Sequence, residues 1–132
     1  MSQIHEKFFD ACHNGDYNGV EIVCENLSVD DVLQSDEVGN TALLYACMNG
    51  NANIIDLLVT YGANIDDYNM YEESCLITAV RGGHYDAVRS LVWTHGANPD
   101  WTNRNGETAL DVAIKCNHHK IAEYLDNVTA IM

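Results

Sequence analysis

The chain repeats itself at a nearly fixed interval. YGANIDD at residues 61–67 returns as HGANPDW at residues 95–101, and extending the match aligns three segments at spacings of 33 and 34 residues. Four positions hold matching residues in these segments: Thr41, Ser74 and Thr108; Leu43, Leu76 and Leu110; Ala46, Ala79 and Ala113; Gly50, Gly83 and Asn117. Ala11 and Gly15 keep the same mutual spacing upstream. The chain therefore holds four copies, and such a period predicts a stack of small structural units.

Each copy has the features of two short helices joined by a tight turn. The hydroxyl that opens a copy can cap a helix by accepting a hydrogen bond from a free backbone N–H. Gly50 and Gly83 suit the left-handed conformation that ends a helix. A second helix follows with an apolar stripe, for example Ile54, Ile55 and Leu58. One copy cannot bury this stripe alone, whereas stacked copies can, and each then contacts only its neighbours.

The segments GNTALLYACMNGNANIIDLLVTYGANID and NGETALDVAIKCNHH resemble the ankyrin-repeat family in their cap, leucine, alanine and glycine positions. The resemblance implies an all-α ankyrin-repeat solenoid of four stacked helix-turn-helix repeats with extended loop fingers. We expect a single domain over residues 1–132, with approximate repeats at 3–36, 37–69, 70–103 and 104–132. In size and layout the chain is similar to small stand-alone members with four repeats.

The chain departs from the family pattern in ways that carry structural predictions. The usual Pro is replaced in the last three copies, and so is the usual His that braces neighbouring loops, which predicts a less rigid solenoid. The third copy has one extra residue, which we place in Trp93–His95, so its second helix should be lengthened or bulged. The first copy has two extra residues, and we expect an irregular connection with a further helical turn at Val29–Leu33.

The chain is strongly acidic, with 20 Asp and Glu against 6 Lys and Arg, a net charge of −14. Residues 1–71 hold twelve acids and one base, or −11, and residues 72–132 hold eight acids and five bases, or −3. This field disfavours nucleic acid and anionic membranes as partners and favours a protein with a basic patch. The alternative is that the charge serves solubility alone.

Cysteine content and the chain ends bear on location. Five cysteines without a zinc-type pair indicate free thiols in a reducing compartment, so we expect a cytoplasmic protein, with the nucleus as the alternative. We see neither a signal peptide nor an apolar stretch that could cross a bilayer. Polar residues at both ends predict capping repeats, a complete small protein and a monomer.

Residues that could carry chemistry are few. CNHHK at 116–120 brings one Cys and two His together, yet zinc needs a fourth ligand. Cys12 and Cys47 fall at small core positions rather than in the electropositive setting of a catalytic thiol. We therefore expect no enzyme activity, no metal and no cofactor; a metal-dependent enzyme is the weakest alternative.

Positions that differ between copies are the candidates for recognition. They fall in the loop fingers and on the exposed side of the first helices, surfaces that the family resemblance associates with partner binding. Tyr, Trp and Arg dominate interface energies. The candidates are Glu37, Tyr45, Met48, Tyr68, Met70, Tyr71, Arg81, Trp101 and Arg104. The wider set adds Val38, Asn40, Asn49, Glu73, Thr78, Thr102, Asn105, Glu107 and Lys115.

The sequence thus predicts a protein–protein interaction module that binds through its concave groove and loop fingers. The first hypothesis is an adaptor or scaffold, and the alternative is a stoichiometric inhibitor that covers an active or assembly site. Folding of Trp101 or Tyr71 back onto the neighbouring finger is the alternative to an interface role for these aromatic residues.

Overall fold

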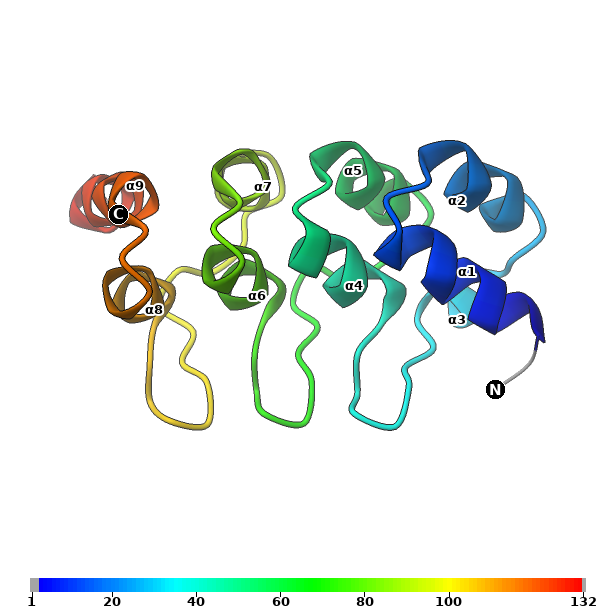
Figure 1. Cartoon of the computed structure of the whole chain (residues 1–132), viewed down its shortest axis with the longest axis horizontal. Helices are drawn as coiled ribbons and strands as arrows, with labels where there is room; N and C mark the ends of the chain where they lie inside the picture. The colour runs from blue at the N-terminus through cyan, green and yellow to red at the C-terminus, as the bar shows by residue number, and fades with distance from the viewer. Residues whose placement is uncertain (1–2, 132) are drawn as a thin grey trace.

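A computed structural model of the chain describes residues 3–131. Within them the helices lie in two parallel rows, and three loops project below as fingers (Figure 1). The first row contains α1 (Gln3–His13), α4 (Ala42–Asn49), α6 (Cys75–Arg81) and α8 (Ala109–Lys115). The second contains α2 (Tyr17–Cys24), α5 (Ala52–Thr60), α7 (Tyr85–Arg89) with η1 (Ser90–Thr94), and α9 (His119–Ile131). The one-turn helix α3 (Val29–Val32) lies outside both rows. This arrangement confirms the predicted all-α solenoid.

The first helices of the last three copies begin where the sequence places a hydroxyl. Each hydroxyl accepts from the backbone N–H three residues on: Thr41 from Leu44 at 3.3 Å, Ser74 from Ile77 at 3.1 Å, and Thr108 from Asp111 at 3.2 Å. The Asp111 carboxylate in turn accepts from the Thr108 N–H, which completes a capping box. The predicted caps are confirmed.

The core runs along the stack between the two rows. The repeated alanines, Ala46, Ala79 and Ala113, are fully buried where neighbouring first helices pack against each other. A methyl group at these positions lets the helices approach closely. Leu43 and Leu76 are buried, whereas Leu110 is only partly buried. Among the described helices, α8 has a neighbouring first helix, α6, on one side only.

Glycines at the turns make room for histidines of the next copy. Gly50 has φ +69°, and a Cβ there would lie 2.1 Å from the His84 ring. That ring donates from Nε2 to the Met48 carbonyl at 2.7 Å. Gly83 relates in the same way to His118, whose Nε2 donates to the Arg81 carbonyl at 3.2 Å. Each histidine therefore ties its copy to the end of the preceding first helix.

Both predicted irregularities are present. The extra residue of the third copy widens the end of its second helix into a π-helix, η1, in which His95 N–H donates to the Ser90 carbonyl at 3.1 Å. The extra residues of the first copy form α3, capped by Ser28 and Asp31. None of the described helices is long and apolar enough to cross a membrane.

Candidate protein-binding surface

The finger turns are built by one polar side chain each: Asp36, Asn69 and Asn103. Its Oδ1 accepts from the backbone N–H groups two and four residues on, at 3.0 and 2.9 Å for Asp36, 2.9 and 3.2 Å for Asn69, and 3.0 and 3.0 Å for Asn103. This Asx-type bonding satisfies backbone donors that no helix or sheet serves. None of these three residues is among the candidates predicted from the sequence, although their spacing of 33 and 34 follows the repeat.

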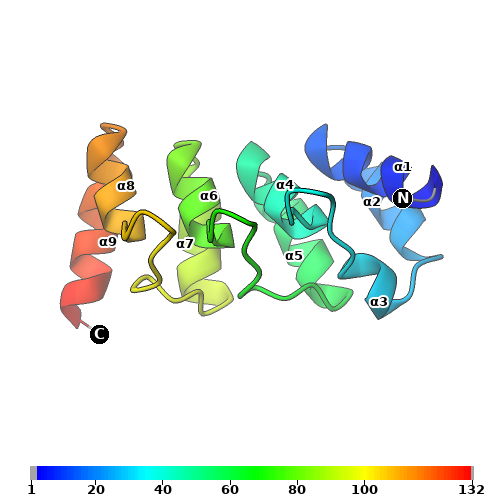
Figure 2. The same cartoon turned by 90° about the horizontal axis from the view of Figure 1, so that it is seen from below.

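The fingers lie side by side (Figure 2), and hydrogen bonds join them. Between the first two, Met70 N–H donates to the Val38 carbonyl at 2.9 Å and Asn69 Nδ2 donates to Asn40 Oδ1 at 3.1 Å. Between the next two, Arg104 N–H donates to the Tyr71 carbonyl at 3.1 Å. These bonds join the fingers in a chain that lacks the bracing histidine of the family pattern. The less rigid solenoid remains a prediction of the sequence.

The third finger is also tied by ionic contacts. Asn103 Nδ2 donates to Glu73 Oε2 at 2.8 Å, and Arg81 pairs with the other oxygen of Glu73 at 2.6 Å. Lys115 lies 3.2 Å from Glu107, whose pKa is lowered by its hydrogen bond from Asn103 and by Lys115. The candidate Arg81 is therefore already engaged within the chain, which leaves it less available to a partner.

Trp101 folds back onto the neighbouring finger. Its indole N–H donates to the Glu72 carbonyl at 2.9 Å, and its ring lies 5.0 Å from the Tyr68 ring, tilted by 33°. The side chain is partly buried and packs on the core. Glu72 has φ +57°, in the left-handed region that favours glycine, and the Trp101 bond helps to hold it there. Trp101 thus packs on the middle finger and helps to stabilise it. This is the alternative to an interface role that the sequence left open for Trp101.

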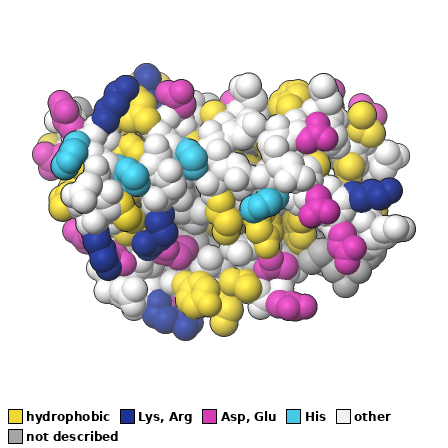
Figure 3. Space-filling model, viewed as in Figure 1, with side chains coloured by type: hydrophobic (Ala, Val, Ile, Leu, Met, Phe, Trp, Pro, Cys, Tyr) yellow, Lys and Arg dark blue, Asp and Glu magenta, His cyan; other side chains and the backbone are white. Residues whose placement is uncertain are grey.

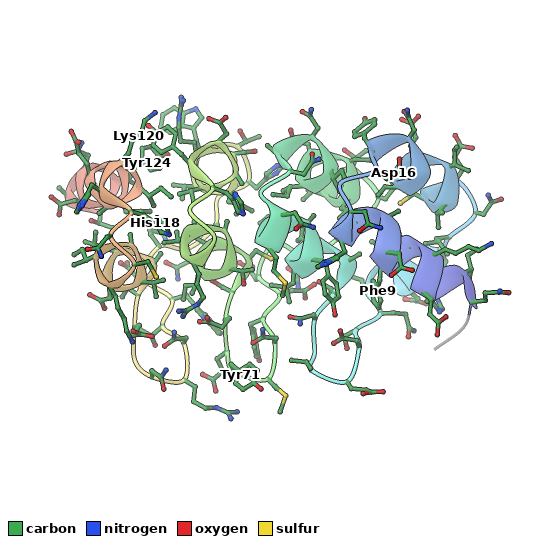
Figure 4. All side chains as sticks on the ribbon, in the orientation of Figure 1. Phe9, Asp16, Tyr71, His118, Lys120 and Tyr124 are labelled. Carbon is green, nitrogen blue, oxygen red and sulfur yellow. The ribbon has the colours of Figure 1, made fainter. Side chains whose placement is uncertain are left out.

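The middle finger presents three large apolar side chains to solvent. Tyr68, Met70 and Tyr71 are 52%, 49% and 53% exposed. Tyr71 lies at the fingertip (Figure 4), and Figure 3 shows apolar side chains gathered at this edge, with basic ones beside them on the next finger. Arg104 of that finger is exposed. We call Tyr68, Met70, Tyr71 and Arg104 the finger surface.

The candidates on α4 are less free than the finger surface. Tyr45 is partly buried, packs against Phe9 at 5.5 Å and His13 at 5.7 Å, and donates from its hydroxyl to Asp36. Burial and this bond raise the Tyr45 pKa. Met48 is also partly buried. Tyr45 therefore contributes to packing between the first two repeats.

The acidic candidate Glu37 is exposed on the first finger. Two members of the wider set were placed wrongly, because Asn40 and Thr78 are 7% and 8% exposed. Asn40 faces Asn69 across the fingers, and Thr78 faces inward from α6.

The thiols are mostly inaccessible. Cys12, Cys24, Cys47 and Cys75 are buried, and Cys116 is partly exposed. Burial raises the pKa of Cys24 to about 11, and it also raises the pKa of Cys12. Residues 3–131 hold no group of three or more His, Cys, Asp or Glu side chains placed to bind a metal ion.

Comparisons with known proteins agree with this architecture. A family model described as "Ankyrin repeats (3 copies)" matches residues 8–103 and again residues 69–130. The "Notch-regulated ankyrin repeat-containing protein" of Xenopus laevis is 31% identical over 94 residues, which are 70% of this chain and 82% of that protein. The "DNA replication inhibitor plutonium" of Drosophila melanogaster is 39% identical over 57 residues, or 43% of this chain. The match spans only 33% of the Drosophila protein.

Proposed function

The chain belongs to the ankyrin-repeat family, whose repeats generally mediate protein–protein interaction, and we propose that it is an adaptor that binds a partner protein through its finger surface. Ankyrin repeats are typically non-enzymatic, and in this proposal the chain needs neither a metal nor a cofactor. It acts as a monomer in the cytoplasm, with the nucleus as the alternative location. The name of the Drosophila relative supports that alternative.

One observation carries the proposal: three large apolar side chains stand about half exposed on a finger that is hydrogen-bonded to both neighbours. The exposed parts of the Tyr68, Met70 and Tyr71 side chains add little to the stability of the fold. A braced finger loses little conformational freedom on binding, so more of the contact energy appears as affinity. Full desolvation of one such aromatic side chain is typically worth about 2 kcal/mol or more.

The charged residues on and near the finger surface indicate what chemical groups a partner should carry. The fingertip cation Arg104 suits an acid or a carbonyl beside the apolar contact. Residues 1–71 carry a net charge of −11, and Glu37 on the first finger belongs to this half. A partner with an apolar anchor for the middle finger and a basic patch toward α1 and α4 would complement both features.

The second candidate function is stoichiometric inhibition. It is supported by the name of the Drosophila relative, an inhibitor, over the part of that protein which the match covers. The two functions differ in valency, because an adaptor holds two partners at once, whereas an inhibitor occupies one and abolishes its activity. Reconstitution with purified partners distinguishes them.

The finger surface is tested by a pull-down from native cell extract with wild type and a Met70→Ala/Tyr71→Ala double variant. Both side chains are exposed, and the hydrogen bonds at these residues use backbone groups, so the fold should survive. Ile22→Ala, which removes a 62% exposed side chain from α2, is the matched control. Loss of specific partners from the double variant alone is expected, and their full recovery would refute the assignment.

The acidic half is tested separately by salt. If it contributes to association, affinity should fall steeply between low and physiological ionic strength, because exposed charges are screened over about 8 Å at 0.15 M. A flat response would leave the acidic charge with a role in solubility alone.

A further inference from the structure

The most exposed large apolar side chain among the described residues lies far from the fingers. Trp93 is 86% exposed and belongs to η1, the π-helix that the extra residue of the third copy creates. Its indole adds almost nothing to the core. Single π-turns within helices occur frequently at functional sites. A solvent-exposed tryptophan on such a turn is therefore a candidate for contact with a ligand.

The π-turn that carries Trp93 is held firmly. Leu91 is fully buried, and its carbonyl accepts from Ala97 N–H at 2.9 Å. On the side toward α5, Asp56 Oδ1 accepts from Ser90 Oγ at 3.2 Å and lies 2.6 Å from His95 Nε2. Trp93 is thus presented on a braced element.

Trp93 lines a cleft between the α7–η1 helix and α9, with a volume of about 480 Å³. Tyr124 of α9 forms part of the wall, together with Asp86, Arg89 and two hydroxyl side chains of η1. Figure 4 shows Tyr124 and Lys120 at the upper edge of the molecule, opposite the edge where Tyr71 lies. We call this hollow the α7–α9 cleft. It is separate from the finger surface.

Two cations, one from the lining of the cleft and one beside it, lie around one aromatic ring. Lys120 Nζ lies 4.1 Å and Arg89 Cζ 5.7 Å from the centre of the Tyr85 ring, which packs against Tyr124 at 6.0 Å. Within residues 3–131 neither cation forms an ion pair. They are two of only six Lys and Arg in the chain.

The surroundings of the cleft are less acidic than the chain as a whole, which has a net charge of −14. Among the lining residues the charge of Arg89 balances that of Asp86. Lys120, which lies beside the cleft on the same tyrosine ring as Arg89, adds one positive charge. Screening over about 8 Å at physiological salt means that these near charges outweigh the distant acids for a ligand in the cleft. Cations held over an aromatic ring without an acidic partner suit an incoming carboxylate.

We propose that the α7–α9 cleft binds a short acidic segment of a second protein, with one apolar side chain of the segment against Trp93 and Tyr124 and its carboxylates on Arg89 and Lys120. A chain with two such surfaces on opposite edges could hold two partners at once. This extends the proposed adaptor function, although the cleft would bind its segment whether or not the finger surface has a partner.

The test begins with random 12-residue peptides displayed on phage and selected on the full chain, with excess Trp93→Ala chain in solution to remove peptides that bind elsewhere. Acidic peptides with one apolar or aromatic residue should be enriched. Failure to enrich any peptide, or enrichment of basic, uncharged or proline-rich peptides, would overturn the proposal.

A selected peptide is then titrated into isotope-labelled chain while the indole N–H signals are recorded by NMR. The sequence has two tryptophans, so the Trp93 signal reports the cleft and the Trp101 signal reports the fingers. The peptide should move the first and leave the second in place. Movement of the Trp101 signal alone would overturn the proposal, and so would a Trp93 signal that shifts with chain concentration, because a second copy would then cover the cleft.

Variants complete the test. Trp93→Ala should weaken the peptide at least tenfold, and Arg89→Glu with Lys120→Glu should abolish binding, whereas Arg104→Glu, a reversal of equal charge at the fingertip, should not. Circular dichroism of each variant verifies folding. Unchanged affinity in the folded Trp93→Ala chain would refute the proposal and leave the finger-surface assignment intact.

Discussion

Replacing Asn69 by alanine should destabilise the protein by about 2–3 kcal/mol. The side chain is 8% exposed and makes three hydrogen bonds: it accepts from Tyr71 N–H and Glu73 N–H and donates to Asn40. Each bond contributes roughly 0.5–1.5 kcal/mol net, and the partners left behind have little access to water. Such a loss is a large fraction of the 5–15 kcal/mol typical of a domain.

Urea unfolding followed by circular dichroism measures this loss as a lower midpoint at unchanged slope. Asn69→Asp should cost less, because Asp36 makes the same two acceptor bonds in the first finger, and only the bond to Asn40 is lost. Asn105→Ala is the control, since that exposed residue is bonded through its backbone N–H. If Asn69→Ala falls within about 0.5 kcal/mol of the control, the fingers are not held by these bonds.

Two further predictions concern a turn and an ion pair. Gly50→Ala should lower the free energy of unfolding clearly more than Gly96→Ala in the same assay. Both glycines have φ near +70°, where an alanine costs about 1 kcal/mol. Only at Gly50 would the added Cβ also clash with the His84 ring. Equal losses of stability would mean that the His84 ring can move aside at little cost. The pKa of Glu107 is lower in the folded chain than in the unfolded chain. The stability that its ionised carboxylate adds to the fold is therefore complete above the unfolded pKa of about 4.3, and it is lost as pH falls through the folded pKa. Glu107→Gln should therefore flatten the fall in stability over this acidic range, and an unchanged profile would show that the Asn103 and Lys115 contacts do not persist in solution.

Much of the architecture follows from the sequence because its determinants are local. A hydroxyl at Thr41 caps the helix that starts at the next residue, and a glycine at Gly50 ends it, so both can be read within a few residues. The position of an inserted residue also follows from the register of the copies, which placed it within Trp93–His95, at the end of the observed Ser90–Thr94 π-helix.

The candidate surface was only partly predictable. Tyr68, Met70, Tyr71 and Arg104 are exposed on the fingers as the pattern suggests, but the same pattern gave Trp101 and Arg81 equal standing and also included the buried Asn40 in the wider set. Trp93 was recognised as part of an insertion and not as a surface feature, although a bulky aromatic residue at an irregular position was the available signal.

The sequence by itself determined the number of copies, their helices and the caps that begin them, since each depends on residues close together in the chain. The tertiary structure alone decided which side chains remain free. Trp101 turns toward Glu72 on the neighbouring finger, and Arg81 toward Glu73 and Glu107, because the folded chain brings these groups within a few ångströms. Such contacts join residues up to 29 positions apart in the chain. Whether a polar or aromatic side chain faces solvent therefore depends on which groups the tertiary structure places beside it.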